Sequence, residues 1–215
     1  MPETFDVVYA DPPWRYDNGT PGREIERHYP TMTHEEICAL DVPSARNAVL
    51  FLWGVAPKLP EALEVMSSWG FTYRTGAVWD KELVGMGYWF RGQHEHLLVG
   101  VKGNWSPPPQ PLRVSSVHRE ARGRHSKKPE AIRNMIATWW PEARRLEMFC
   151  RYPAPGWHAW GNQVDSTVAA LPFERFDPHA DPDQAALFGE QRHVCPGYQN
   201  TGCVDPDCDK RTGVA

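Results

Sequence analysis

The stretch DVVYADPPWRYD, residues 6–17, decides the fold, because an apolar run ends there abruptly in an acid, two prolines and a tryptophan. The run up to Ala10 is typical of a buried β-strand. Pro12 and Pro13 lack the backbone N–H that a central strand donates, so the strand has to stop before them. An ordinary turn is one interpretation, since Asp-Pro and Pro-Pro both favour turns. The other is a binding site, because open α/β sheets bind ligands at the carboxyl ends of their strands.

The rest of the chain alternates apolar strands with amphipathic helices. Thr33 and Glu36 have the spacing of a helix-capping box, and Pro129 is a favoured first residue of a helix. We expect helices after Thr33, across 58–70 and from Pro129, and strands at 5–10, 48–53, 71–79, 94–103, 144–151 and within 155–163. This alternation predicts an α/β domain with a mostly parallel sheet that is covered on both faces.

Composition divides the chain into two parts. The 215 residues, 41% of them hydrophobic, suit one domain with an appendage. From about Asp165 onward Pro, Asp and Gln dominate, so we expect one packed domain over 1–164 and a largely disordered, acidic, Pro-rich tail over 165–215. The sequence contains no long apolar run and no export signal, so we expect no membrane segment and a cytoplasmic location.

The net charge of −4 argues against a nucleic-acid partner, but the charge is unevenly distributed. From Asp165 to the end nine acids accompany four bases, which leaves 18 acids and 19 bases before that point. The segment from Arg113 to Lys128 holds six bases and the single acid Glu120. Such a basic loop suits contact with phosphates, although a solvated loop is the plainer alternative.

The cysteines do not indicate a metal site. Cys38 and Cys150 lie in or beside apolar stretches, so we expect buried thiols in a reducing compartment. The tail offers four residues of zinc-binding types, but without the CxxC spacing of common zinc sites, and we favour scattered thiols over a metal. These four residues are His193, Cys195, Cys203 and Cys208.

Three further segments carry polar residues near expected element ends. RHSKKPE, residues 124–130, places two lysines before a helix N-terminus, where anions are favoured. EMFCR puts Glu147 and Arg151 about the end of a strand, suited to ribose hydroxyls and to a carboxylate. WGNQ supplies the amides of Asn162 and Gln163. Each signal is weak alone, and together they predict a pocket for a zwitterionic, ribose-bearing nucleoside cofactor.

These motifs occur in a recognisable order. An apolar strand into DPPW is followed by HYPTMTHEEI, LFLWG, HEHLLVGVKG, HSKKPE, EMFCR and WGNQ. In this the sequence resembles, over about residues 5–164, the adenine-N6 methyltransferase family of the eukaryotic messenger-RNA adenosine methyltransferase and its bacterial and phage DNA-modifying relatives. The resemblance implies a Rossmann-like fold, S-adenosylmethionine as cofactor, and a permuted motif order with the catalytic motif first.

The resemblance also implies roles for individual residues. The catalytic motif is Asp11, Pro12, Pro13 and Trp14: the Asp11 carboxylate and the Pro12 carbonyl would accept hydrogen bonds from the adenine amine, and Trp14 would stack on the base or wall it. Tyr29 and Glu95 would line the acceptor side. The cofactor side would comprise Lys128, Glu147, Arg151, Asn162 and Gln163, with Lys128 and Arg151 near the cofactor carboxylate and the amides at its ribose.

The resemblance implies methylation of the N6 amine of adenine in nucleic acid. We expect DNA as the substrate, because the chain lacks the long extensions of the eukaryotic RNA enzymes. RNA is the alternative, and a catalytically inactive nucleic-acid-binding scaffold is the alternative from another class. A homodimer and a heterodimer both stay open.

Overall fold

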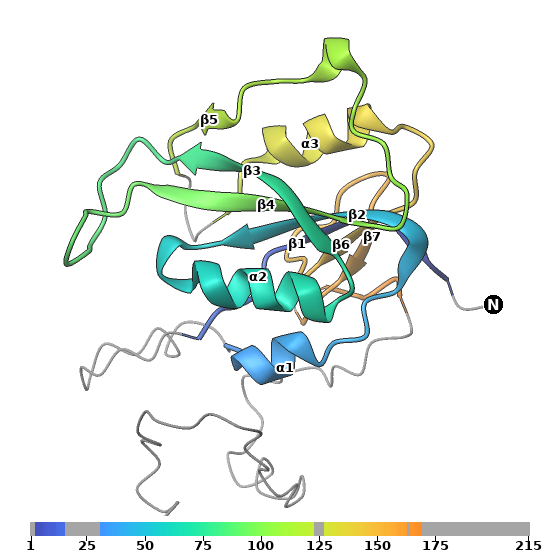
Figure 1. Ribbon diagram of the computed structural model, residues 1–215, viewed down its shortest axis with the longest axis horizontal. Helices are drawn as coiled ribbons and strands as arrows, with labels where there is room; N and C mark the ends of the chain where they lie inside the picture. Colours follow the sequence, from blue (N-terminus) through green and yellow to red (C-terminus); the bar gives the residue numbers. More distant parts are fainter. Residues whose placement is uncertain (1–2, 16–30, 123–126, 163, 169–215) are drawn as a thin grey trace, which may run out of the picture. The chain divides into compact units, whose positions relative to one another are not determined.

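The computed structural model describes residues 3–15, 31–122, 127–162 and 164–168, and all of them belong to one unit that spans Met1–Phe176 (Figure 1). Its strands form a mixed sheet in the order β5-β3-β4-β2-β1-β6-β7. The strands are β1 (Phe5–Ala10), β2 (Ser44–Gly54), β3 (Thr72–Asp80), β4 (His94–Lys102), β5 (Val117–Arg119), β6 (Arg145–Met148) and β7 (His158–Trp160). The helices are α1 (His34–Cys38), α2 (Leu59–Ser68) and α3 (Glu130–Trp139), with short 3₁₀ turns η2 (Ala56–Lys58) and η3 (Gln110–Leu112).

The predicted helix and strand signals correspond to real elements. Thr33 caps α1 as expected, because its hydroxyl accepts from the Glu36 N–H and the Glu36 carboxylate accepts from the Thr33 N–H. The chain leaves α2 through Gly70, whose positive φ of 80° suits a residue without a Cβ. Pro129 lies one position earlier than predicted, as the N-cap of α3.

The sheet is mostly parallel, as predicted, and β4 is the exception. β4 runs antiparallel to both of its neighbours, β2 and β3, whereas the other strand pairs are parallel. The connection between β3 and β4, residues 81–93, contains no helix, and a strand that returns without a crossover pairs antiparallel. The sequence also gave no sign of β5, a three-residue strand inside the basic loop.

The sheet has an apolar layer on each face. On β2, Leu50 and Leu52 pack with the cluster that includes Met66 of α2, whereas Phe51 and Trp53 pack with the cluster that includes Ile136 of α3. Figure 1 shows α2 and α1 on one side of the sheet and α3 on the other. A strand buried on both faces needs a continuous apolar run, which is what AVLFLW provides.

The packed part of the chain continues beyond the boundary expected at residue 164. The Thr167 N–H donates to the Ala159 carbonyl at 2.9 Å, the Thr167 hydroxyl accepts from the Ala159 N–H at 3.0 Å, and Val168 is buried. The expected tail beyond residue 168 lies outside the described residues. None of the described helices has the length and apolar character needed to span a membrane.

We therefore predict that a chain ending at residue 163 is less stable than one ending at residue 176. The shorter chain loses two hydrogen bonds to β7 and the buried Val168 side chain, together worth roughly 3 kcal/mol. The melting temperature should fall by at least about 5 °C, measured by circular dichroism on both chains. Equal melting temperatures would show that the segment after β7 does not contribute to the stability of the fold.

Candidate active site

The DPPW segment leaves β1 as a clamped turn. The Trp14 N–H donates to the Pro12 carbonyl at 2.9 Å, and the Met32 N–H donates to the Pro13 carbonyl at 3.0 Å. The Trp14 indole N–H donates to the Trp53 carbonyl at 3.2 Å, which ties the turn to the end of β2. These bonds fix the backbone that carries the Asp11 carboxylate at the carboxyl end of β1.

Trp14 lies deeper than its expected role suggests. Its side chain is only 8% exposed and belongs to the apolar cluster on the α2 side of the sheet. The indole therefore anchors the turn, and its stacking on a target base stays a prediction.

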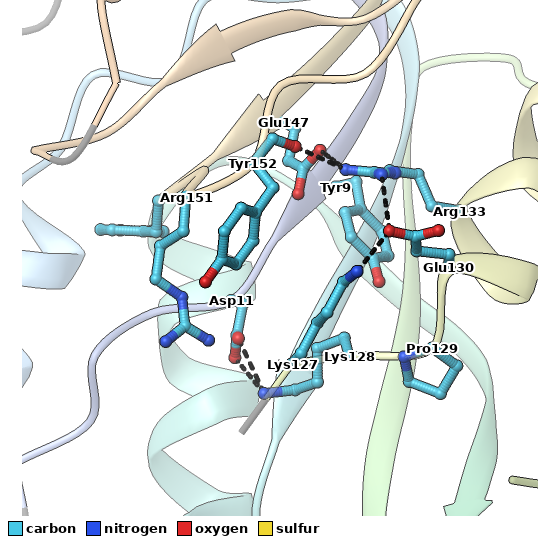
Figure 2. Close-up of a pocket in the computed structure, with 11 residues that line it drawn as sticks. Tyr9, Asp11, Lys127, Lys128, Pro129, Glu130, Arg133, Glu147, Arg151 and Tyr152 are labelled. Carbon is cyan, nitrogen blue, oxygen red and sulfur yellow. Dashed lines mark hydrogen bonds and ion pairs between the residues drawn. The ribbon is translucent and has the colours of Figure 1, made fainter. Parts of the chain in front are cut away.

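The largely buried Lys128 ammonium joins two carboxylates that were both expected on the acceptor side. The Lys128 ammonium lies 2.7 Å from both carboxylate oxygens of Asp11 (Figure 2). It also lies 3.3 Å from a carboxylate oxygen of Glu95. With three N–H donors, this ammonium has one for each of these oxygens. Lys128 thus holds the acceptor-side carboxylates, where the prediction had placed it against a cofactor carboxylate.

The charge of Lys128 is stabilised by these neighbours. Burial alone would lower its pKa, but the attraction of Asp11 and Glu95 outweighs burial and raises the pKa above its ordinary value. Glu95 also pairs with Lys81 at 3.2 Å. The result is a continuous chain of alternating charges, Lys81–Glu95–Lys128–Asp11, that runs from β3 to β1.

A cavity lies beside this chain of charges, at the carboxyl ends of β1 and β6. Figure 2 shows its lining side chains, which come from β1, β6 and the start of α3. The lining comprises Tyr9, Asp11, Lys127, Lys128, Pro129, Glu130, Arg133, Glu147, Phe149, Arg151 and Tyr152. The predicted residues Asp11, Lys128, Glu147 and Arg151 are therefore brought together around one opening.

Arg133 organises the far side of this cavity, and sequence reasoning missed it. Its guanidinium donates to the Glu147 carboxylate at 2.7 Å and to the Tyr152 carbonyl at 3.0 Å. Burial raises the pKa of Glu147, although the pairing with Arg133 opposes that rise. Among the described residues the Arg133 Nε–H finds no acceptor, so a buried donor at this wall is left for another group.

The backbone at the end of β6 is strained. Phe149 has a φ of 61°, a left-handed conformation that is rare for a bulky residue and that concentrates at functional sites. Gly161 allows the neighbouring strand to approach, because a Cβ there would lie 2.3 Å from the Cys150 carbonyl oxygen. Cys150 is buried as expected, and burial raises the pKa of its thiol to about 11, which disfavours the reactive thiolate.

Of the remaining predicted site residues, one does not line the cavity and two lie outside the described residues. Asn162 follows β7 and is not one of the residues that line the cavity. Tyr29 and Gln163 lie outside the described residues, as do the four tail residues of zinc-binding types. The part of the chain that the structure describes contains no group of side chains suited to holding a metal.

Three bases of the loop before α3 have separate partners in the structure. Arg119 pairs with Asp80 at 3.5 Å, Lys127 pairs with Glu130 at 2.5 Å, and Arg113 donates to the Pro108 carbonyl at 3.1 Å. Arg119 and Lys127 stay largely exposed, with 72% and 45% of their side chains in solvent. Two of these charges therefore remain accessible to phosphates.

The chemistry of the cavity fits a zwitterionic nucleoside such as S-adenosylmethionine. The Glu147 carboxylate can accept hydrogen bonds from hydroxyls or an ammonium, and the Arg151 guanidinium can donate to a carboxylate. Phe149 and Tyr152 offer flat apolar surface. The Arg133 Nε–H adds a buried donor without a protein acceptor among the described residues.

Comparison with known proteins gives a family match over most of the chain. The model of the MT-A70 family matches residues 5–163. A type II methyltransferase of a Mycoplasma species, M.MunI, is 33% identical over 189 residues, which cover 78% of this chain and 81% of that protein.

Eukaryotic relatives match over a smaller part of their own length. The human N(6)-adenosine-methyltransferase catalytic subunit METTL3 is 33% identical over 198 residues, which cover 87% of this chain and 31% of the human protein. An Arabidopsis thaliana N(6)-adenosine-methyltransferase MT-A70-like protein is 31% identical over 173 residues, which cover 75% of this chain and 24% of the plant protein.

We predict that Lys128→Met destabilises the fold, because it leaves the Asp11 carboxylate without its cation and Glu95 with Lys81 alone. The expected loss is about 3 kcal/mol of unfolding free energy, at the lower end for breaking a buried pair since Asp11 keeps access to water. Urea unfolding measures the loss. Adding Glu95→Gln to Lys128→Met should recover part of the stability, and no recovery would show that the two carboxylates do not share the ammonium.

Proposed function

Because the chain belongs to the MT-A70 family, we propose that it is an S-adenosylmethionine-dependent methyltransferase that acts on the N6 amine of adenine in DNA. The family predicted from the ordered motifs is confirmed by the match over residues 5–163 and by a relative that is 33% identical over most of both chains. The observation that carries the proposal is the Asp11 carboxylate, held by Lys128 at the end of β1 beside a cavity of cofactor-binding character.

The amine of adenine is a poor nucleophile, because its lone pair is delocalised into the ring. The Asp11 carboxylate and the Pro12 carbonyl form a pair of acceptors that can take the two amine hydrogens. The Trp14 N–H occupies one lone pair of the Pro12 oxygen and leaves the other available. Holding both hydrogens makes the nitrogen more tetrahedral and frees its lone pair for attack.

Electrostatics at the site supports the same reaction. S-adenosylmethionine, when bound, supplies a methyl group activated by a sulfonium centre. As the amine nitrogen forms its bond to the methyl carbon, the carbon–sulfur bond breaks and the positive charge passes from sulfur to nitrogen, which then releases a proton to water. The chain of charges Lys81–Glu95–Lys128–Asp11 ends in the Asp11 carboxylate, whose negative charge stabilises a positive charge that develops beside it. The reaction needs no nucleophilic side chain, so positioning and fixed charges can supply the catalysis.

The choice of DNA rests on how much of each relative the chain matches. The chain covers 81% of the type II methyltransferase but only about a third or less of the two eukaryotic N(6)-adenosine-methyltransferases. RNA adenosine is the second candidate, because those eukaryotic relatives share the same segment. An inactive scaffold is disfavoured, since Asp11 and the contacts that fix it are present.

Nucleoside mass spectrometry tests the substrate. DNA and RNA are isolated from cells that lack their own adenine methylation and express the protein. We expect N6-methyladenine in DNA. Methylation confined to RNA would replace the proposed substrate, and no methylation in either polymer would support a scaffold.

We predict that Asp11→Ala abolishes most methyl transfer while it preserves the fold. Loss of a preorganised group of this kind costs roughly 2.7–4 kcal/mol at the transition state, which is two or more orders of magnitude in rate. Tritium transfer from labelled cofactor to DNA measures the rate, and circular dichroism checks folding. Asp41→Ala, at an exposed carboxylate between α1 and β2, is the matched control and should keep the parent rate. A folded Asp11→Ala protein with near-parent activity would contradict the mechanism.

A further inference from the structure

The connection between β3 and β4 carries an exposed aromatic tip, defined here as residues 86–90. Tyr88, Trp89 and Phe90 are 103%, 95% and 89% exposed, and Met86 is 76% exposed. Consecutive large apolar side chains in full contact with water are unfavourable, and such a patch marks an interaction site. The site described above does not use any of these four residues.

Backbone hydrogen bonds close the aromatic tip into a tight turn. The Gly85 N–H donates to the Gly92 carbonyl at 2.8 Å, and the Gly92 N–H donates to the Met86 carbonyl at 3.2 Å. Within this closed turn a Cβ on Gly87 would lie 1.9 Å from the Phe90 carbonyl oxygen. Glycine at position 87 therefore permits a turn tight enough to direct the three rings outward.

The stem of the loop is tied to the catalytic carboxylate. The Gln93 amide donates to the Asp80 carboxylate at 2.8 Å, and the Lys81 N–H donates to the Gln93 carbonyl at 2.9 Å. Lys81 then begins the chain of charges that ends at Asp11 through Glu95 and Lys128. Figure 1 shows the loop extending from the edge of the sheet at which β2 and β3 end. The aromatic tip thus has a fixed position relative to the group that receives the adenine amine.

Duplex DNA presents a geometric difficulty for this reaction. The N6 amine of adenine is paired and stacked inside the helix, so a methyltransferase has to extrude the base, which costs unpairing and unstacking energy. A flat side chain that enters the stack replaces the lost contacts, as apolar wedges do in proteins that kink DNA. Stacking of a base on an aromatic side chain is sequence-tolerant and contributes substantially to binding.

We propose that the aromatic tip is a wedge, led by Trp89, that enters the base stack of duplex DNA and stabilises the extruded adenine opposite Asp11. This inference rests on the proposed function, because it takes duplex DNA as the substrate. Arg91 follows the tip directly and is exposed, which places a cation where a phosphate backbone would pass. A second copy of the chain is the other candidate occupant, but a stable protein interface needs roughly 800 Å² per partner, far more than a single five-residue turn offers.

The test compares Trp89→Ala with the parent on three DNA substrates. Sequencing of methylated genomic DNA from expressing cells first locates the modified site. The substrates are then a synthetic duplex with that site, the same duplex with an abasic position opposite the target adenine, and the target strand alone. Tyr73→Ala, on β3 and 48% exposed, is the matched control for loss of a surface aromatic ring. Tritium transfer gives rates, and 2-aminopurine fluorescence at the target position reports extrusion of the base.

If the aromatic tip acts as a wedge, Trp89→Ala loses methyl-transfer rate on double-stranded DNA but not on single-stranded DNA. Trp89→Ala should lower the rate on the intact duplex about tenfold or more, reduce the fluorescence rise, and leave the single strand within about threefold of the parent. The abasic duplex should recover most of the rate, because it lowers the cost of extrusion. Tyr73→Ala should behave as the parent on all three substrates.

Other results overturn the wedge. Equal losses of Trp89→Ala on duplex and single strand would place Trp89 in the base pocket, and parent-like rates on both would remove the tip from the reaction. Size-exclusion chromatography that shows a dimer only when Trp89 is present would assign the tip to a second copy. Failure of the parent protein to methylate any duplex would instead overturn the proposed substrate, so the two failures are distinguishable.

Discussion

The Lys128 ammonium is the interaction on which the geometry of the site depends. It joins the segment after β1, the amino end of β4 and the segment before α3, three parts of the chain that are far apart in sequence. A lysine side chain only 13% exposed is tolerated only with carboxylate partners, and two neighbouring carboxylates are tolerated only with a cation between them. Each of the three segments is therefore held in place by the other two. This mutual dependence orients the Asp11 carboxylate.

Much of the fold could be predicted because its local signals agree with its tertiary environment. The continuous apolar run of β2 indicates a strand buried on both faces, and the Thr33–Glu36 pair indicates a capped helix start. The direction of β4 could not be obtained from the same signals, since periodicity is identical in parallel and antiparallel strands. The direction of β4 follows instead from the connection between β3 and β4, which contains no helix and therefore favours an antiparallel return. β5 is too short at three residues for any periodicity to appear.

The site was predicted less completely, for a physical reason. Motif order identified Asp11, Lys128 and Glu147, yet it assigned ligands to residues one at a time and so could not show that Lys128 contacts Asp11. Arg133 was missed because a single arginine in an amphipathic helix normally faces solvent. Arg133 lies one turn after Glu130 on α3, near Ile132 and Ile136. Its role becomes evident only in the folded protein, where β6 places Glu147 opposite it. The strain at Phe149 likewise depends on the packing of β7 and leaves no mark in sequence.

The reversal of β4 divides the molecule into two halves that are free to change to different degrees. On one half, β1, β6 and β7 run side by side, and the ends of β1 and β6 lie at the cavity, so an inserted or deleted residue there would disturb several neighbours at once. On the other half, β3 and β4 are joined by a turn whose own hydrogen bonds close it at Gly85 and Gly92. Length and sequence beyond that closure can vary while the register of the sheet is preserved. Evolution, or an engineer, can therefore diversify what this scaffold docks against while its chemical centre stays constant.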